Sequence, residues 1–297
     1  MANLMNVACI ILNYNDYLTT EQLIKHIHEF DSLDNIVIVD NCSSNDSYNK
    51  LLKYRSNKIR VIKTDKNKGY GAGNNYGVMY CKEVLNSDYV VIANPDVIFD
   101  EEFVVECIEV LKKESDVAIV TGLMLDGHSM EVQKNAWYIP TAIEEVIDSS
   151  SILKRIVSFL NRDKKHELYD LENKYFEAVA GSLFAMDVNK FIEIGMFDED
   201  IFLYCEENIL AIKMKEAGYR AARLNNIKYK HFHSTSISKE YKKMYYRKKI
   251  LIDSKKIVIS KYYPISKFKK KFLFFMLDLF MIEAAIIEFF KIIARIK

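Results

Sequence analysis

Long uncharged hydrophobic runs, paired cysteines and repeated motifs are all missing from this sequence of 297 residues. The five cysteines are odd in number and include no Cys-x-x-Cys pair, which argues against a disulfide framework or a zinc site and indicates a reducing compartment. The N-terminus has neither a basic segment nor a cleavage-like site, so we predict no signal peptide. Half of the residues are hydrophobic. The chain therefore has enough apolar residues to form a large folded core, and extensive disorder is not expected.

The chain as a whole has almost no net charge, but its last part is strongly basic. The formal net charge is only +1. Residues 239–297 carry 16 Lys and Arg but five Asp and Glu, a balance of +11, whereas the remainder carries 26 and 36, a balance of −10. Such a basic segment favours anionic partners, which include phosphates, nucleic acid and acidic lipid headgroups.

Short apolar segments alternate with helical patterns through the first half of the chain. The predicted strands cover 7–12, 35–40, 58–63, 89–94 and 117–125. The predicted helices cover 18–30, 47–54, 74–85 and 101–113. Strands that are apolar on both faces are typical of a parallel sheet with helices on either side. The fold class is therefore α/β. Further on, 175–187 resembles another strand, and 206–219 a helix that ends at Gly218.

Polar residues gather where these strands end. The first strand is followed by Asn13-Tyr14-Asn15, the second by Asp40-Asn41-Cys42-Ser43, the third by a glycine-rich segment at 67–75, and the fourth by Asn94-Pro95-Asp96. In a doubly wound sheet these ends converge on one crevice, which is where such sheets bind ligands. Each group taken alone has a simpler interpretation, because Asn, Pro, Asp and Gly also form turns and helix caps.

Seven segments occur in the order and spacing of glycosyltransferase family 2. They are IILNYN, IVIVDNCSSND, NKGYGAGNNYG, YVVIANPDV, AGSLFAMD, GMFDEDIFLYCEEN and KHFHSTS, within about residues 5–255. The sequence most resembles the rhamnosyltransferase-like enzymes of bacterial surface-polysaccharide synthesis. The resemblance implies a GT-A fold with a mostly parallel central sheet. We expect a nucleotide-binding half at about 1–126, an acceptor half at about 127–238, and a helical extension at 239–297.

The resemblance also assigns residues to the nucleotide and to a metal ion. The implied nucleotide-binding residues are Asn13, Tyr14, Asn15, Asp40, Asn41, Ser43, Asn67, Gly69, Gly73, Asn74 and Asn94. Asp40 would hydrogen-bond the base. Asp96 would ligate Mg²⁺ or Mn²⁺ on the donor diphosphate, because hard divalent cations prefer carboxylate and phosphate oxygens. The first acid of the family's Asp-x-Asp motif is Asn94 here. His231 or His233 would complete the metal shell, unless they are simply histidines at a strand edge.

The block Glu206-Glu207-Asn208-Ile209 occupies the place of the family's catalytic acids. The resemblance implies that Glu207 is the base that deprotonates the acceptor hydroxyl, and that Glu206 is the acid before it. A later acid of the family pattern is Ile209 in this chain. Two glutamates in the first turn of a helix are also favourable for structural reasons alone. Three further residues would line the donor-sugar and acceptor side, namely Gly181, Ser182 and Asp198.

The basic extension joins a lysine cluster, which is Lys267, Lys269, Lys270 and Lys271, to a Phe-rich apolar segment. After Lys271 no uncharged run exceeds six residues, so a simple transmembrane helix is not predicted. The composition favours the surface of an anionic membrane. The alternatives are a helix that packs on the body of the protein or forms a homodimer interface. No nucleic-acid-binding fold is recognised, so nucleic acid is not expected as a partner.

These observations predict a metal-dependent, inverting glycosyltransferase. It would use a nucleotide-sugar donor and a lipid-linked surface glycan as acceptor, in the cytoplasm on the inner face of the cell membrane. A nucleotidyltransferase should instead show a glycine-rich loop with a basic residue after the first strand, and NYNDYL shows neither. The non-enzymatic alternative is a degenerate family member that binds nucleotide or glycan, or acts as a scaffold. This alternative stays open because the chain departs from the family pattern at three positions, which are Asn94, Glu207 and Ile209.

Overall fold

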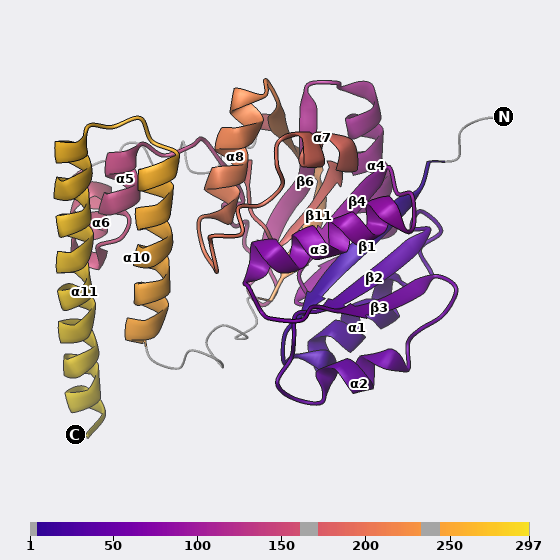
Figure 1. Cartoon of the computed structure of the whole chain (residues 1–297), viewed down its shortest axis with the longest axis horizontal. Helices are drawn as coiled ribbons and strands as arrows, with labels where there is room; N and C mark the ends of the chain where they lie inside the picture. Colours follow the sequence, from indigo (N-terminus) through magenta and orange to yellow (C-terminus); the bar gives the residue numbers. More distant parts are fainter. Residues whose placement is uncertain (1–4, 161–171, 233–243, 297) are drawn as a thin grey trace.

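The computed structural model of the chain describes residues 5–160, 172–232 and 244–296, and its centre is one large mixed sheet (Figure 1). In spatial order this sheet contains β3 (Ile59–Lys63), β2 (Asn35–Asp40), β1 (Val7–Asn13), β4 (Tyr89–Ala93), β10 (Leu183–Asp187), β6 (Val117–Asp126), β11 (Arg220–His231) and β5 (Val97–Phe99), and β8 (Tyr175–Phe176) pairs with β11. A small second sheet contains β7 (Ala136–Trp137) and β9 (Ala178–Val179). The α/β fold class is therefore confirmed.

The register of the first four strands brings their carboxyl ends to one edge of the sheet. β3, β2, β1 and β4 are parallel neighbours, and Asn13 pairs with Asp40, which pairs with Lys63. Beyond β4 the direction changes, because β10 runs antiparallel to both β4 and β6. The sequence pattern at 175–187 suggested one strand, but the segment forms β8, β9 and β10. The segment divides because these three strands pair with three different partners, β11, β7 and the β4–β6 pair.

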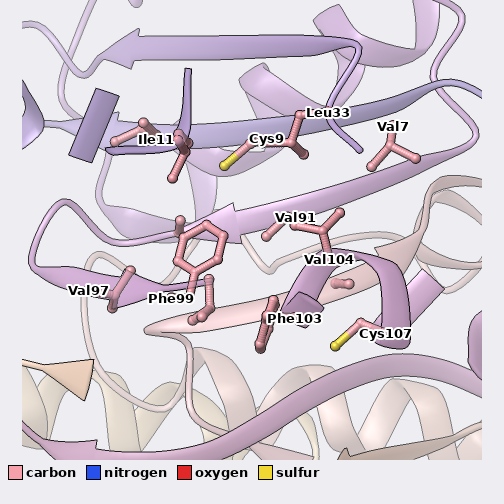
Figure 2. Close-up of a cluster of buried hydrophobic side chains, with 14 of the residues drawn as sticks. Val7, Cys9, Ile11, Leu33, Val91, Val97, Phe99, Phe103, Val104 and Cys107 are labelled. Carbon is pink, nitrogen blue, oxygen red and sulfur yellow. The ribbon is translucent and has the colours of Figure 1, made fainter. Parts of the chain in front are cut away.

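Helices cover both faces of the sheet. One face is covered by α1 (Tyr17–Ile27), α2 (Ser47–Leu52) and α4 (Glu101–Lys113), and the other by α3 (Tyr70–Glu83), α7 (Val188–Glu193) and α8 (Glu206–Glu216). Figure 2 shows alternate β1 residues Val7, Cys9 and Ile11 in the same cluster as Phe103 and Cys107 of α4. The intervening β1 residues are buried on the opposite face. Because both faces are covered, the strands are apolar throughout instead of alternating with polar residues.

Helix α3 begins at Tyr70, whereas the sequence pattern predicted a helix only from residue 74. The turn is made at Gly69, whose φ of 105° is left-handed and whose added Cβ would lie 2.0 Å from the Phe202 carbonyl oxygen. An added Cβ at Gly73 would lie 2.5 Å from Leu12 Cδ1. The glycines therefore allow the start of α3 to pack closely against β1 and a distant loop.

The C-terminal helices stand beside the sheet together with α5 (Ala142–Ile147) and α6 (Ser151–Leu160) (Figure 1). The two C-terminal helices are α10 (Met244–Lys261) and α11 (Lys267–Ile296). Val258 of α10 packs in a buried cluster with Ile201, Cys205 and Ile209, so α10 contacts the segment around α8 directly. Helix α11 packs in turn on α10 and α5. Within the described ranges, none of the helices is both long and apolar enough to span a bilayer.

Candidate active site

A buried hydrogen-bond network joins the carboxyl ends of β1 and β2. The Asn13 amide donates to Asp40 (Nδ2–Oδ2 2.8 Å) and to Ser43 (Nδ2–Oγ 3.2 Å). The Ser43 backbone N–H donates to Asp40 Oδ1 at 2.9 Å. The Asp40 side chain is fully buried, and both of its oxygens accept hydrogen bonds within this network. Asp40 thus fixes the loop after β2, and its hydrogen bond to a base stays a prediction.

The remaining predicted nucleotide residues surround this network. Asn15, at a left-handed φ of 57°, accepts hydrogen bonds from the Ser44 and Asn45 backbone N–H groups, and Tyr14 beside it is half-buried. The Asn41 amide donates to Asn67 Oδ1 at 3.1 Å and to the Gly69 carbonyl at 3.0 Å. These contacts connect the loop after β2 to the start of α3.

Asn74 lies on α3 and is fully buried. Its amide nitrogen donates to the Tyr70 carbonyl, while its Oδ1 atom has no hydrogen-bond partner among the described residues. An unsatisfied buried amide oxygen carries a free-energy cost, which a ligand donor or a water molecule could offset. A cavity of about 430 Å³ lies between the loop after β2 and the start of α3, and its lining includes Asn41, Lys68 and Asn75.

The predicted metal ligands Asp96 and His231 lie next to each other. Asp96 follows β4, His231 ends β11, and His231 pairs with Val97 of β5. The His231 Nε2 and Asp96 Oδ1 atoms are 3.4 Å apart, and the side chains are 14% and 9% exposed. Asp96 also lines a cavity of about 690 Å³, whose other lining residues include Thr19, Gln22, His128 and Phe232. His233 lies outside the described residues.

This pair of side chains fits a divalent cation that is shared with a ligand. The described part of the chain contains no group of three or more His, Cys, Asp or Glu side chains arranged around a common metal position. One carboxylate and one imidazole leave most of an octahedral shell to other donors. Mg²⁺ and Mn²⁺ sites commonly complete such a shell with phosphate oxygens and water. The residues present therefore fit an ion that binds together with a diphosphate better than one held by the protein alone.

Glu206 and Glu207 form the first turn of α8, and the backbone before them is strained. Tyr204 and Cys205 both have left-handed φ values, 73° and 71°. Each such residue costs about 1–3 kcal/mol, and it persists only where its surroundings hold it. The turn directs Glu207 toward the segment before β10, where its Oε1 atom accepts a hydrogen bond from the Gly181 N–H at 3.2 Å.

Burial raises the pKa of both carboxyl groups, but their neighbours act on them differently. Burial, together with the negative charge of Glu207, raises the pKa of Glu206 to about 8. Burial also raises the pKa of Glu207, although backbone N–H groups, including that of Gly181, oppose the shift by stabilising its ionised form. At neutral pH Glu206 is therefore the protonated partner. Glu207, which accepts the N–H hydrogen bond, is the carboxyl suited to act as a base.

A short hydrogen-bonded bridge links Glu207 to the loop that holds Asn94 and Asp96. The Ser182 carbonyl, next to Gly181, accepts a hydrogen bond from the Asn94 N–H at 2.8 Å. The Ser182 hydroxyl is 2.9 Å from the Tyr229 hydroxyl. Hydrogen bonds thus connect four of the predicted residues, even though Asn94 and Glu207 are far apart in the sequence. The four are Asn94, Gly181, Ser182 and Glu207. The two tyrosines that secure this segment, Tyr229 and Tyr70, were not predicted, because nothing in their local sequence distinguishes them from ordinary core aromatics.

Tyr70 donates a hydrogen bond to the Gly181 carbonyl and so joins the start of α3 to the segment before β10. Tyr70 is half-buried, and desolvation of its hydroxyl together with the nearby glutamates raises its pKa well above the usual value. It therefore stays a neutral hydrogen-bond donor. An added Cβ at Gly181 would lie 3.1 Å from Glu207 Oε1 and 3.2 Å from the Tyr70 hydroxyl oxygen. This close packing leaves little space for a side chain at residue 181.

Asp198 contacts the C-terminal end of α10. It accepts hydrogen bonds from Lys261 (3.2 Å), the last residue of α10, and from Tyr262 (2.6 Å), which follows it. Burial alone would raise its pKa, but these hydrogen bonds and one from the Asp200 N–H outweigh burial and lower it. Asp198 is therefore an ionised anchor for α10, and its predicted contact with sugar or acceptor stays a prediction.

Comparisons with known proteins concern the family and the fold of the chain. The family model described as Glycosyl transferase family 2 matches residues 8–185. The low-salt glycan biosynthesis hexosyltransferase Agl10 of Haloferax volcanii is 27% identical over 222 residues, which cover 74% of this chain and 62% of that protein. The rhamnosyltransferase WbbL of Escherichia coli K12 is 24% identical over 161 residues, which cover 51% of this chain and 56% of that protein. The chain thus spans about three fifths of the length of these curated relatives.

A solved structure shares the fold. The mannosyltransferase PcManGT of Pyrobaculum calidifontis, in complex with GDP-Man and Mn²⁺, superposes with a TM-score of 0.58 at 13% identity. The match covers 94% of this chain and 73% of that one. Because identity is so low, this match supports only the fold, which is the GT-A arrangement expected from the sequence.

Proposed function

Because the chain belongs to glycosyl transferase family 2, we propose that it transfers a sugar from a nucleotide donor to a glycan acceptor, with inversion at the anomeric carbon. The observation that carries this proposal is the bridge from Asn94 through Ser182 and Gly181 to Glu207. It joins the loop of Asp96, which fits a metal-bound diphosphate, to a half-buried carboxylate that can accept a proton. Inverting transfer needs these two groups on opposite sides of the reacting carbon.

Each residue has a separate part in this mechanism. Asp96 and His231 would hold Mg²⁺ or Mn²⁺, which when bound neutralises charge on the departing nucleoside diphosphate. Glu207 takes the proton of the acceptor hydroxyl. At the same time the acceptor oxygen bonds to the anomeric carbon, and the bond between that carbon and the diphosphate breaks. Glu206 stays protonated, so the developing positive centre faces a single ionised carboxylate. The loops after β1 and β2 would bind the nucleoside.

Donor binding can be tested without knowing the acceptor. We expect one group of nucleotide sugars to raise the melting temperature of the purified protein, and to raise it further when Mn²⁺ is present, because ligands that bind only the native state stabilise it. At a concentration of 100 times Kd the gain is about 2.7 kcal/mol. Thermal shift with a panel of donors would measure this effect. Absence of a shift for every nucleotide sugar, with and without metal, would contradict the proposal.

We further propose that the acceptor is lipid-linked and that the protein acts at the cytoplasmic face of the cell membrane. The supporting feature is an exposed apolar stripe on α11, opposite the face that packs on α10. Its residues are Phe268, Phe272, Phe275, Leu279, Ile282, Ile286, Phe289 and Phe290. From Phe268 to Phe289 they recur every three or four residues, and Phe290 lies four residues after Ile286, so all of them share one side of the helix. Three exposed residues of α6 add to the apolar surface, namely Ile152, Ile156 and Phe159.

Charge favours a membrane over a second copy of the chain as the partner of this stripe. Helix α11 begins with the lysine cluster, and the sequence is basic again at residues 291–297. A dimer that paired two such stripes would bring basic ends together in either orientation. Anionic headgroups would instead neutralise them, at about 1 kcal/mol per lysine near the surface. A helix with this composition lies in the plane of the interface with its apolar side inserted.

The stripe can be tested by substitution. We expect Phe272→Glu/Phe275→Glu to abolish co-sedimentation with phosphatidylserine-containing vesicles, because the inserted side chains supply the part of binding that salt does not screen. Wild-type protein should stay bound at high salt. Truncation after Lys271 would be a poorer test, because α11 also covers buried Ile252 and Ile259 of α10.

A matched control places the same charges on another exposed apolar surface. Val84 and Val105 are 57% and 45% exposed on the sheet domain. Val84→Glu/Val105→Glu should sediment with vesicles like wild type. The contradicting result is a wild-type protein that does not bind vesicles and forms a dimer, which Phe272→Glu/Phe275→Glu converts to monomers. The stripe would then be a protein interface, and the membrane proposal would be wrong.

A further inference from the structure

A buried ion pair lies behind the catalytic helix, away from the donor crevice. Lys255 of α10 places Nζ 2.9 Å from Glu145 Oε2 of α5, and the two side chains are 7% and 2% exposed. Lys255 also donates to the backbone carbonyl of Glu145. Neither the nucleotide site nor the apolar stripe uses this pair. Buried ion pairs of this kind often add no stability over apolar side chains of similar size, so stability alone is a weak reason for its presence.

The second oxygen of Glu145 contacts the catalytic helix. Glu145 Oε1 accepts a hydrogen bond of 2.6 Å from the side-chain amide of Asn208. The Asn208 oxygen accepts another, of 2.8 Å, from the Trp137 indole N–H. Asn208 directly follows Glu207 in α8, and adjacent helix residues point about 100° apart. The rotation of the first turn is therefore fixed by Asn208 on one side and by the bond between Glu207 and Gly181 on the other.

A neighbouring contact holds the strained backbone before α8. Ser254, next to Lys255 on α10, donates its hydroxyl proton to the Leu203 carbonyl at 2.7 Å. Leu203 immediately precedes Tyr204 and Cys205, the two residues with left-handed φ. Helix α10 therefore secures both the entry to α8 and, through Glu145, its first turn. A left-handed pair of this kind needs such external support to persist.

We propose that Glu145 and Lys255 are positioning residues of the transfer reaction: they hold Asn208, and through it the first turn of α8, so that Glu207 faces Gly181. The inference rests on the proposed function for its effect on turnover, but the positioning itself is a property of the fold. Neither residue touches substrate. Lys255 orients Glu145, and Glu145 supplies the acceptor that Asn208 needs. A displacement of about 1 Å in a catalytic group can cost of order a hundredfold in rate.

Two double variants separate positioning from stability. Glu145→Leu/Lys255→Met removes both buried charges and also removes the acceptor for Asn208. Glu145→Gln/Lys255→Met removes the same charges but keeps a side-chain oxygen for Asn208. Because neither variant leaves an uncompensated buried charge, both should melt close to wild type. We expect the Leu/Met variant to lose about 10- to 100-fold in kcat with little change in the KM for the donor, and the Gln/Met variant to stay near wild type.

Hydrogen exchange of residues 203–209 gives a readout that does not depend on turnover. Amides in this segment should exchange faster in Glu145→Leu/Lys255→Met than in wild type, and at near wild-type rates in Glu145→Gln/Lys255→Met. Equal exchange and equal kcat in the two variants would overturn the proposal. If wild type turns over no donor, the proposed function fails, and the exchange comparison still decides the positioning role.

Discussion

Glu207→Gln is expected to lower kcat by about 10²–10⁴-fold and to leave donor binding almost unchanged. The amide keeps the shape of the side chain and can still accept the Gly181 N–H, but it cannot take a proton from the acceptor hydroxyl. Single-turnover kinetics with saturating donor would measure the loss in the chemical step. A drop in donor affinity with unchanged kcat would show that Glu207 binds substrate instead of acting as the base.

Glu206→Gln is the matched control. Glu206 has its pKa raised to about 8, so near pH 7 it is already neutral and glutamine reproduces its charge and shape. We expect most activity to remain. In the wild type, activity should fall as the pH decreases through the raised pKa of Glu207, because the base works only when ionised. If Glu206→Gln is inactive while Glu207→Gln is active, the two roles are exchanged.

Asp96→Ala is expected to reduce transfer by about 10²–10⁴-fold and to remove the effect of Mn²⁺ on nucleotide binding. A metal ion contributes several kcal/mol of stabilisation to the charge that develops on the leaving diphosphate, and Asp96 is the carboxylate placed to hold it beside His231. Calorimetric titration of nucleoside diphosphates, with and without Mn²⁺, would measure the binding term.

Asp126→Ala is the control for Asp96→Ala. Asp126 lines the same cavity, but its carboxylate accepts hydrogen bonds from the His128 and Ser129 N–H groups, which lower its pKa. Its removal should leave the metal dependence intact. If Asp96→Ala folds normally and still binds nucleotide in a Mn²⁺-dependent way, the metal role assigned to Asp96 is wrong.

Much of this site could be predicted because its residues follow apolar strands. Asn13, Asp40, Asn94 and Asp96 each end or follow a strand, and the parallel register brings these ends together. The meeting of Asp96 with His231 could not be derived from local patterns, because it depends on the pairing of β5 with β11. The resemblance to a family supplied that expectation.

Other features depend on packing that no local pattern records. Glycines at 69 and 73 suggested a loop, yet close contacts with Phe202 and Leu12 place them at the start of α3. The sequence placed Asp40 at the end of a strand, but only the structure shows that its side chain is fully buried and accepts hydrogen bonds from Asn13 and Ser43. Glu145 and Lys255 are separated by 110 positions and resemble ordinary surface charges of helices. Only the tertiary structure shows that they meet behind α8.

The central claim is that the chain transfers sugar from a nucleotide donor, and release of nucleoside diphosphate tests it most directly. Wild-type protein should be incubated with Mn²⁺, a panel of nucleotide sugars and membrane lipid extract as a source of acceptor, beside Glu207→Gln and Asp96→Ala. The account predicts multiple turnovers of one donor by wild type, and loss of turnover in both variants. Donor binding by wild type without any turnover, or turnover that both variants retain, would contradict it, and the first result would instead support a degenerate, nucleotide-binding member of the family.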